Sequence, residues 1–346
     1  MKKKLASLEV QSPVQKLKSV LVTGGAGYIG SHVVRELVRS GYRVVVLDNL
    51  SKGHRAAVDG VEVIVGDLSD RKLLSNLFQK REITAVLHFA ARSLVGESMR
   101  EPAAYYRNNV LAGLSLLDTM VAAGVPYLVF SSTAAVYGEP KKIPIPEGHT
   151  GLPTNPYGAS KHALEEAIRW YGEAYGLNYA VLRYFNAAGA DLEGDIGEDH
   201  NPETHIIPMV LKVALGLYSR ISVFGNDYPT PDGTCIRDYV HVSDLAAAHV
   251  LALKTLACGA QSSMYNLGSE RGHSVLEVIR MAEIVSGKRI QVEYAARRPG
   301  DPAILVASSE KARQELGWRP RFTGLADIIK TAWRWHSSHP EGYGKE

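Results

Sequence analysis

The chain has 346 residues, of which 45% are hydrophobic, and its formal net charge is +3. This length predicts one large domain or two unequal ones with a sizeable core. The small net charge excludes general nucleic-acid binding, so an acidic small molecule would need locally placed positive charge.

The cysteine count and the distribution of apolar residues further restrict the class of protein and its compartment. The two cysteines, Cys235 and Cys258, exclude a disulfide framework and offer no metal-ligand spacing. We therefore expect buried thiols, no metal site and a reducing compartment such as the cytoplasm. No apolar run approaches the roughly 18 residues that span a bilayer, so we expect no membrane association. Residues 1–17 begin with basic residues but contain no apolar signal segment, and we interpret them as a flexible tail.

Apolar, β-branched runs alternate with segments of helical periodicity through the first half of the chain. The predicted strands occupy residues 19–24, 43–48, 61–67, 85–90 and 127–132. The predicted helices between them occupy residues 31–41, 71–81 and 109–124. Strand and helix in alternation imply right-handed crossovers, which predicts an α/β fold with a doubly wound parallel sheet of the Rossmann type.

The composition then changes. Residues 191–205, DLEGDIGEDHNPETH, are acidic and Gly-rich and lack periodicity, and short strands such as residues 221–225 follow between loops. We predict a large Rossmann domain over residues 18–186 and a smaller, mixed α/β substrate-binding lobe over residues 187–340. A helical pattern within residues 235–260 predicts that this segment returns to the larger domain.

A glycine-rich segment, TGGAGYIGSH, follows the first predicted strand and opens the first predicted helix. Its glycines at 25, 27 and 30 match G-x-G-x-x-G, which permits a tight turn and lets a pyrophosphate approach N–H groups at the helix start. Asp48 ends the second strand about 20 residues on, where a carboxylate accepts from a ribose diol and repels a 2′-phosphate. The sequence therefore predicts NAD rather than NADP, although the cations of DNLSKGHR weaken that preference. Asp67, which ends the third predicted strand, is either an acceptor for the adenine amino group or a strand-end cap.

Tyr157 and Lys161 stand four residues apart in NPYGASKH. A proline at the predicted helix start and the apolar periodicity that follows predict that the pair shares one helix face. A second Y-x-x-x-K match, Tyr137 and Lys141, contains Pro140 and cannot lie in a helix interior. The sequence context therefore favours the Tyr157 pair.

A bound NAD would give this pair a chemical role. Tyrosine is a poor base at neutral pH, but a neighbouring cation, either Lys161 or the nicotinamide ring, favours its phenolate. Tyr157 could then take a proton from a substrate hydroxyl while hydride leaves the same carbon. Thr133 follows a predicted strand at the sheet edge where ligands bind and would hydrogen-bond the same oxygen.

Six motifs together resemble the extended short-chain dehydrogenase/reductase superfamily, and within it the UDP-glucose 4-epimerase family: TGGAGYIG, FSSTAAVYG, NPYGASK, LRYFNAAGA, FGNDYPTPDGTCIRDYVHV and RRPGDPA. The resemblance covers about residues 18–335 and implies catalysis by Tyr157, Lys161 and Thr133. It also implies NAD contacts, besides Tyr157 and Lys161, at Gly24, Gly27, Tyr28, Ile29, Gly30, Asp48, Asn49, Leu50, Ser51, Asp67, Leu68, Phe89, Ala90, Ala91, Asn108, Ser131, Tyr184 and Phe185. The implied UDP-sugar contacts, besides Thr133 and Tyr157, are Asn186, His205, Ile206, Val223, Phe224, Arg237, Arg298, Asp301 and Leu305.

The resemblance implies interconversion of UDP-glucose and UDP-galactose in galactose metabolism. Hydride leaves C4 of the sugar for tightly bound NAD, the 4-keto sugar swings about its link to the diphosphate, and hydride returns to the other face. Such a reaction needs a tight grip on UDP and a loose grip on the hexose. Arg237 and Arg298 suit the first need, because guanidinium binds phosphate oxygens in a bidentate manner.

Two positions depart from the common family pattern, and a third bears on substrate choice. Ser93, with Arg92 beside it, stands where many members have Lys, and His205 stands where Asn is common. In the family, a position after RR-x-GD helps decide whether an N-acetyl group fits, because Tyr closes the pocket and a small residue opens it. Alignment puts Leu305 there, or Ile304 after a one-residue slip, and we expect UDP-N-acetylglucosamine to be tolerated.

Some other functions of this fold would need different residues at some of these positions. A 4,6-dehydratase would need acids directly after the catalytic Thr, where this chain has Ala134 and Ala135. A non-catalytic NAD-binding regulator would tend to lose the Tyr or the Lys, and both are present. A UDP-xylose/UDP-arabinose 4-epimerase would keep every residue named. The family implies a homodimer, for which the helices at residues 109–124 and 160–176 are the candidate interface.

Overall fold

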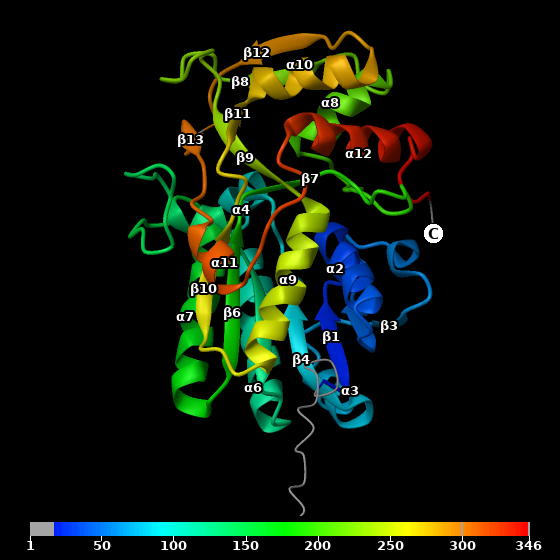
Figure 1. The fold of residues 1–346 in the computed structure, drawn as a ribbon, viewed down its shortest axis with the longest axis vertical. Coiled ribbons are helices and arrows are strands. Elements are labelled where there is room, and N and C mark those ends of the chain that lie inside the picture. Colours follow the sequence, from blue (N-terminus) through cyan, green and yellow to red (C-terminus); the bar gives the residue numbers. More distant parts are fainter. Residues whose placement is uncertain (1–16, 299, 345–346) are drawn as a thin grey trace, which may run out of the picture.

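The computed structural model describes residues 17–298 and 300–344, so the predicted tail falls almost wholly outside the described residues. A seven-stranded sheet forms the larger part of the molecule (Figure 1), in the order β10-β6-β5-β4-β1-β2-β3. All six pairings are parallel. This confirms the predicted fold class. The strands are β1 (Ser19–Thr23), β2 (Val44–Asp48), β3 (Glu62–Val65), β4 (Ile83–His88), β5 (Tyr127–Thr133), β6 (Asn178–Tyr184) and β10 (Ser263–Leu267).

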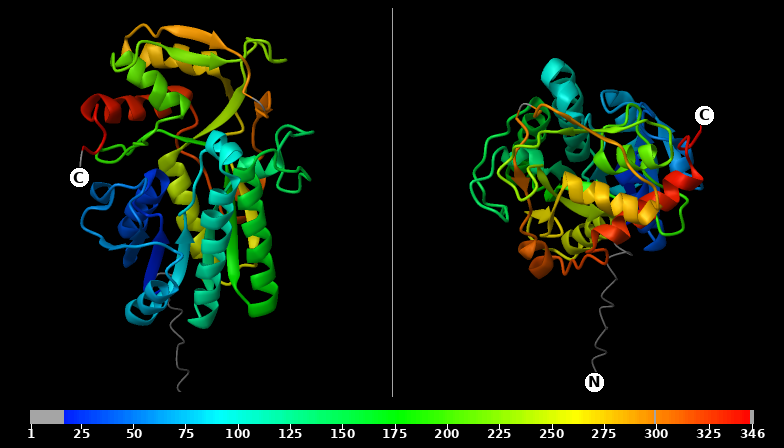
Figure 2. Two further views of the ribbon diagram at one scale, coloured as in Figure 1. Left: turned by 180° about the vertical axis from the view of Figure 1, so that it is seen from behind. Right: turned by 90° about the horizontal axis from the view of Figure 1, so that it is seen from above.

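Helices cover both faces of this sheet, which explains why its central strands are apolar on both sides. On one face, α2 (Tyr28–Arg39) and α9 (Val242–Ala257) pack against each other and share a core with the strands. On the other, α3 (Arg71–Arg81), α6 (Ala112–Ala122) and α7 (Pro156–Tyr175) enclose a second core. Figure 2 shows this second layer from behind.

The crossover from β4 to β5 differs from its prediction. The periodicity predicts one helix over residues 109–124, but α6 begins at Ala112 and is preceded by a π-helical segment, η2 (Tyr106–Leu111). Before it come α4 (Val95–Arg100) and α5 (Pro102–Tyr105). π-Helical turns are frequent at functional sites, and this one carries Asn108.

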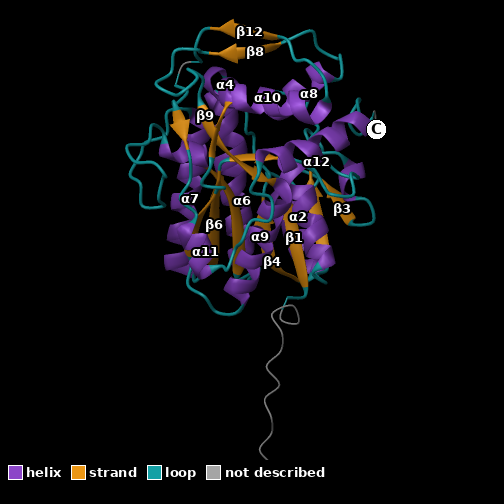
Figure 3. Ribbon diagram, turned by 45° about the horizontal axis from the view of Figure 1, so that its top comes forward, coloured by secondary structure: helices purple, strands orange, loops and turns teal. Residues whose placement is uncertain are grey.

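The smaller lobe is built around β9 (Ile236–His241), which pairs with β7 (Asn186–Ala188), β11 (Gly272–Ser274) and β13 (Ile304–Leu305). Two further strands, β8 (Ile221–Phe224) and β12 (Val292–Ala295), pair with each other. Figure 3 shows the helices of this lobe beneath that pair. They are α8 (Ile206–Ala214), α10 (Val275–Ser286) and α12 (Leu325–Ser338), and they share a core of their own.

The chain passes between the two parts more than once. Within residues 235–260, β9 belongs to the smaller sheet while α9 packs on α2. β10 then extends the large sheet beside β6, and α11 (Glu310–Glu315) packs near it on the same part. The remaining short helices are η1 (Arg55–Val58) and η3 (Ala134–Tyr137). Among the described residues, no helix is both long and apolar enough to cross a membrane.

Candidate active site

The glycine-rich turn between β1 and α2 is shaped by close backbone contacts. Gly24 has φ of +71°, and a Cβ there would lie 2.5 Å from the nitrogen of Ala90. A Cβ on Gly30 would lie 2.2 Å from the oxygen of Gly24. Gly27 caps α2 without a side chain, and the first intrahelical bond runs from Ser31 N–H to the Gly27 carbonyl at 2.9 Å. The first-turn N–H groups of α2, which include those of Tyr28 and Ile29, therefore lack a side-chain acceptor within the helix.

Two carboxylates stand at the ends of the neighbouring strands. Asp48 is buried and accepts hydrogen bonds from the N–H groups of Ala26 (3.0 Å) and Leu50 (2.9 Å). Burial raises the pKa of Asp48, and these bonds oppose that rise. Leu50 has φ of +57°, which turns the chain sharply after β2. Asp48 is thus fixed against the glycine-rich turn, as a ribose-binding carboxylate must be.

Asp67 lies at the outer side of the same edge. Its Oδ2 accepts from Asn49 Nδ2 (2.8 Å), and its Oδ1 accepts from the hydroxyl (2.6 Å) and N–H (2.9 Å) of Ser69. The Ser69 hydrogen bonds are the main cause of a lowered pKa of Asp67. Ser51 donates to the Asn49 side chain, and Leu68 is buried in the second core.

The segment after β4 lies against the glycine-rich turn at Gly24. The N–H groups of Phe89 and Ala90 both donate to the carbonyl of Thr23, at 2.8 and 3.0 Å. The N–H of Arg92, next to Ala91, donates to the side chain of Asn108 at 3.0 Å. The guanidinium of Arg92 forms an ion pair with Glu97 at 3.3 Å. Arg92 therefore binds residues of the neighbouring helical segments α4 and η2.

The start of α7 positions Tyr157. Asn155 caps the helix by accepting from the N–H of Gly158 at 2.9 Å, and Pro156 occupies the first turn. A Cβ on Gly158 would lie 2.5 Å from the carbonyl oxygen of Ala135, so the helix start lies directly against η3. The Thr133 side chain hydrogen-bonds to Tyr157. Thr133, at the end of β5, and Tyr157, in the first turn of α7, thus meet at the carboxyl edge of the parallel sheet.

Lys161 lies one turn further along α7 and is buried. Its Nζ donates to the carbonyl of Ser131 at 2.8 Å and lies 4.8 Å from the centroid of the Phe130 ring. Burial lowers the pKa of Lys161 to about 7, although the carboxylate of Glu165 opposes the shift. The Ser131 hydroxyl also hydrogen-bonds with that of Tyr184. Tyr184 therefore lies next to the hydrogen bond between Lys161 and Ser131.

The protein alone does not activate the Tyr157 phenol. Burial raises the pKa of Tyr157, and the Thr133 hydrogen bond only partly opposes this. Desolvation also lowers the pKa of Lys161 to about 7, so its ammonium is only partly charged near neutral pH. Which of the two predicted cations, Lys161 or the nicotinamide ring, lowers the pKa of Tyr157 stays a prediction.

The sequence analysis did not predict a buried charged network around Glu165 of α7. Glu165 lies one turn after Lys161 and forms an ion pair with Arg183 at 2.5 Å. The hydroxyl of Ser132 donates to Glu165 at 2.5 Å, and Arg183 also donates to the Tyr137 hydroxyl at 3.1 Å. Tyr137, the tyrosine of the rejected Y-x-x-x-K match, is a core residue that is 1% exposed. The signal for this network was an acid at helical spacing from Lys161.

Predicted UDP-sugar contacts gather on the smaller lobe. Arg237, on β9, is buried and forms an ion pair with Asp301. The guanidinium of Arg298 stacks 4.0 Å above the centroid of the Phe224 ring. Val223 is 1% exposed and packs in the lobe core, so its side chain cannot contact a ligand. The alternation along β8 directs Val223 inward and Phe224 outward.

Leu305 lies beside these residues. It is paired with Arg237 in the parallel register of β13 and β9. Leu305 and Phe185 are both partly buried and pack on the same small cluster, which contains Tyr137. Asn186, the next residue after Phe185, begins β7. The structure thus brings Leu305 to the border between the predicted nicotinamide and sugar contacts.

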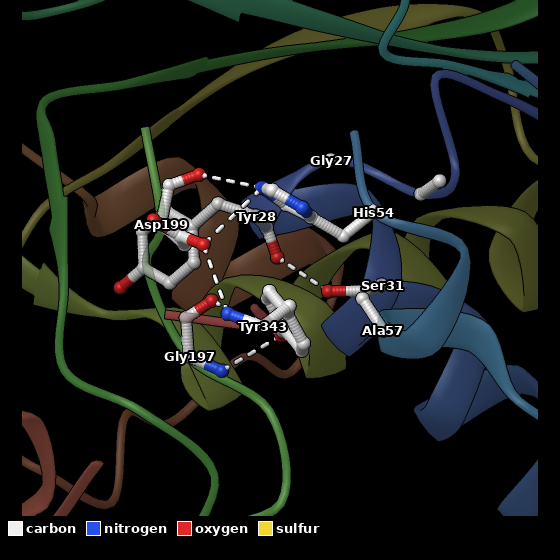
Figure 4. A pocket seen from close by; sticks show the side chains of 9 residues that line it. Gly27, Tyr28, Ser31, His54, Ala57, Gly197, Asp199 and Tyr343 are labelled. Atoms are coloured by element: carbon white, nitrogen blue, oxygen red, sulfur yellow. Dashed lines mark hydrogen bonds and ion pairs between the residues drawn. The ribbon is translucent and has the colours of Figure 1, made fainter. Parts of the chain in front are cut away.

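The segment before α8 reaches back to the glycine-rich turn. Figure 4 shows the small hollow between them, lined among others by Gly27, Tyr28 and Asp199. The Tyr28 hydroxyl donates to the carbonyl of Gly189 at 2.6 Å, so its side chain is engaged by the smaller lobe. His205 caps α8 just before Ile206, and its Nδ1 lies 2.5 Å from Glu198 Oε1. Burial lowers the pKa of His205, but the Glu198 carboxylate outweighs it and the net shift is upward.

Fold and site together define an NAD-dependent enzyme of the extended short-chain dehydrogenase/reductase type. A family model described as the NAD dependent epimerase/dehydratase family matches residues 20–268, and the chain belongs to this family.

Individual relatives narrow this class. The chain is 54% identical to the UDP-glucose 4-epimerase of Halalkalibacterium halodurans over 95% of this chain and 98% of the relative. A crystal structure of a UDP-glucose 4-epimerase superposes with a TM-score of 0.92 and 52% identity, covering 94% of this chain and 100% of the other. The UDP-glucose 4-epimerase of Bifidobacterium longum, in complex with NAD⁺ and UDP, superposes with a TM-score of 0.89 and 38% identity over 94% and 100% of the two chains.

Proposed function

We propose that this protein interconverts UDP-glucose and UDP-galactose by inverting C4 through a 4-keto intermediate, as an isomerase of galactose metabolism. The observation that carries the proposal is the meeting of Tyr157 and Thr133 at the sheet edge that also holds the glycine-rich turn. A base beside a dinucleotide site fits removal of a hydroxyl proton from a secondary alcohol. Relatives at about half identity carry the UDP-glucose 4-epimerase name, which supports this assignment.

The residues of the turn fit NAD. The backbone approaches so closely at Gly24 that no side chain would fit, and the helix start at Gly27 has no side-chain cap; both features suit a pyrophosphate. The fixed carboxylate of Asp48 suits a ribose diol. Bound NAD supplies a hydride acceptor in the first half of the reaction and a hydride donor in the second. Tyr28 would contribute its backbone N–H, because its hydroxyl is engaged by Gly189.

The chain's own residues move the proton. Tyr157 takes the proton of the C4 hydroxyl, and Thr133 holds the same oxygen. On return, Tyr157 gives the proton back to the oxygen of the inverted sugar. Lys161 orients the strand end through the Ser131 carbonyl at 2.8 Å.

Inversion requires that the keto sugar turns over while UDP stays bound. We expect Arg237 and Arg298 to hold the diphosphate; at present Arg237 is paired with Asp301, and Arg298 stacks on Phe224. We propose that phosphate oxygens take over part of this ion pair on binding. Leu305 and Phe185 offer apolar surface without hydrogen bonds to the hexose, which leaves the sugar free to rotate.

A second substrate class follows from Leu305. Its position beside Arg237 in the β9–β13 pair favours UDP-N-acetylglucosamine as an additional substrate, because Leu is shorter than Tyr. A coupled assay of UDP-galactose, UDP-N-acetylgalactosamine and UDP-arabinose, side by side, tests the proposal. The proposal predicts the highest kcat/KM with UDP-galactose. Higher activity with UDP-arabinose would instead identify the pentose 4-epimerase.

We further propose that the protein is a homodimer in the cytoplasm. Leu111, Trp170 and Tyr175, on η2 and α7, are 59%, 56% and 63% exposed. Large apolar side chains gathered on adjacent helices are typical of subunit interfaces. Cys235 is buried, but Cys258 is exposed, so the expectation of two buried thiols is wrong for Cys258. Both thiols are unpaired, which supports a reducing compartment. Sedimentation of the purified chain at two concentrations measures the oligomeric state.

A further inference from the structure

Four side chains with metal-ligating atoms meet in the segment before α8. Each of Glu198, His200, Glu203 and His205 offers one ligand atom, and these atoms all lie within 4.8 Å of one another. Glu198 Oε1 lies 2.5 Å from His205 Nδ1 and 3.3 Å from His200 Nδ1. Glu203 Oε2 lies 3.7 Å from His200 Nδ1. This cluster is separate from Tyr157 and Lys161, and sequence reasoning predicted no metal site anywhere.

Two atoms of the cluster are buried without a hydrogen-bond partner. These are Glu203 Oε2 and His200 Nδ1, and the Glu203 side chain is only 1% exposed. A buried carboxylate oxygen without a donor is costly. Because the oxygen points at His200 Nδ1 across 3.7 Å, the gap between them is too wide for a hydrogen bond. A cation between these atoms would satisfy both.

We propose that Glu198, His200, Glu203 and His205 bind one divalent transition-metal ion, of which zinc fits best. Metal binding displaces the protons that His200 and His205 hold against the Glu198 and Glu203 carboxylates, and two neutral imidazoles and two carboxylates then carry a charge that balances a divalent cation. Imidazole ligands favour zinc over magnesium or calcium, which prefer all-oxygen sites. Four protein ligands without an open position are typical of a structural site.

A second group of acids serves as a contrast. Asp191, Glu193 and Asp195 also lie close together. However, Arg35 forms ion pairs with all three, and Arg39 forms ion pairs with Asp191 and Glu193. Their charge is therefore already balanced, and this group contains no imidazole.

The metal would fasten the substrate lobe to the dinucleotide-binding part. His205 caps α8, and the ring of His200 lies edge-on to the ring of Tyr28 with centroids 6.2 Å apart. A hollow of about 350 Å³ beside the cluster, lined in part by Lys212 and His339, gives an ion a path from solvent. The ion would hold the 198–205 segment in place and take no part in the chemistry at Tyr157.

Zinc counting on the full chain, freed of any affinity tag and treated with a chelator, tests this proposal. Zinc is added back, excess ion is removed by gel filtration, and zinc per chain is measured by mass spectrometry. Affinity is measured by competition with a chromophoric zinc indicator. The variants are His200→Ala and Glu203→Gln. The matched control is Glu193→Gln, the same substitution in the acidic group, and Cys258→Ser removes the exposed thiol as a rival ligand.

The proposal predicts about one zinc per chain in the unaltered protein and in both controls, with affinity at least about 10-fold weaker in His200→Ala and Glu203→Gln. Circular dichroism checks that each variant is folded. If His200→Ala fails to fold, the zinc affinity of Glu203→Gln, which keeps the size of the side chain, decides the test. Equal zinc affinity in the unaltered protein and in Glu203→Gln would overturn the proposal. Displacement of zinc by magnesium at similar concentration would contradict coordination by imidazole and overturn the proposal. Because no substrate is present, this result is independent of the epimerase assignment.

Discussion

Lys161 donates a hydrogen bond from its Nζ to the main-chain carbonyl of Ser131 at 2.8 Å. The contact joins α7, which carries Tyr157, to the end of β5, which carries Thr133. Lys161 is thus a brace between the two elements that position the proposed proton-transfer residues. It is also buried, with a pKa lowered to about 7, so its charge is only partly present at neutral pH. These two roles can be separated by experiment.

Tyr157→Phe should remove the base and leave the fold intact, because the ring remains and only the hydroxyl is lost. We expect kcat to fall by at least about 10²-fold, the lower end for general base catalysis. Nucleotide released on denaturation should match that of the unaltered protein. Activity within a factor of about three of the unaltered enzyme would remove Tyr157 from the mechanism, since that is far below the usual range.

Lys161→Met should lower activity and move the pH optimum of kcat upward, because the phenolate loses a stabilising cation. The pH–rate profiles of the two proteins provide the measurement. An unchanged profile with reduced kcat would mean that Lys161 acts only as a brace through Ser131. In that case the positive charge of the nicotinamide ring alone tunes Tyr157.

The same variant should change how stability depends on pH. The pKa of Lys161 is about 7 when folded and 10.5 ordinarily, so between these values the unfolded chain binds a proton that the folded chain lacks. The free energy of unfolding of the unaltered protein therefore gains from this group as pH rises from about 7 toward 10, and Met lacks the effect. Melting temperatures of the cofactor-depleted proteins should shift in favour of the unaltered chain across this window. Parallel curves would show that the pKa of Lys161 is not depressed.

Asp48→Ala should weaken NAD retention and relax discrimination against NADP. The change removes the ribose-diol acceptor, the repulsion of a 2′-phosphate and the acceptor of the Ala26 N–H. Cofactor content of the purified proteins measures retention, and activity after reconstitution with each dinucleotide measures discrimination. Asp67→Asn, at the next strand end, is the control and should leave NADP discrimination unchanged. Equal NAD content in Asp48→Ala and the unaltered protein contradicts the assignment.

Leu305→Tyr should selectively remove activity on UDP-N-acetylglucosamine and keep most activity on UDP-galactose. The larger side chain, next to Arg237 in the strand pair, would fill the space proposed for the N-acetyl group. Ile304→Tyr tests the one-residue slip, because the neighbouring strand residue points to the opposite face and only one of the two can face the sugar. An unchanged ratio of the two kcat/KM values in Leu305→Tyr means that Leu305 does not face the sugar.

Local patterns predict the parallel sheet and the helix start that carries Tyr157. Strand periodicity, the glycine spacing and the helix start at Asn155 and Pro156 are properties of neighbouring residues, and such signals are readable in one sequence. Contacts between distant segments were not readable. The pairing of β10 with β6 and the ion pair between Glu165 and Arg183 depend on the folded arrangement.

Contacts of the smaller lobe were likewise not predictable from the sequence. Its β8 strand was predicted, but the sequence did not reveal that Val223 points into the core while Phe224 stacks on Arg298. The cluster containing Glu198 and His205 lies in a segment without periodicity. Alternating acids and histidines within eight residues were its one visible signal.

Solvent isotope incorporation tests the central claim most directly. UDP-galactose is incubated with the purified protein in deuterium oxide without added cofactor, and the UDP-glucose formed is analysed by NMR at C4. If hydride leaves and returns on tightly bound NAD while Tyr157 exchanges only the hydroxyl proton, C4 of the product carries protium. Deuterium at C4 would mean that the hydrogen leaves as a proton, and it would contradict the proposed mechanism.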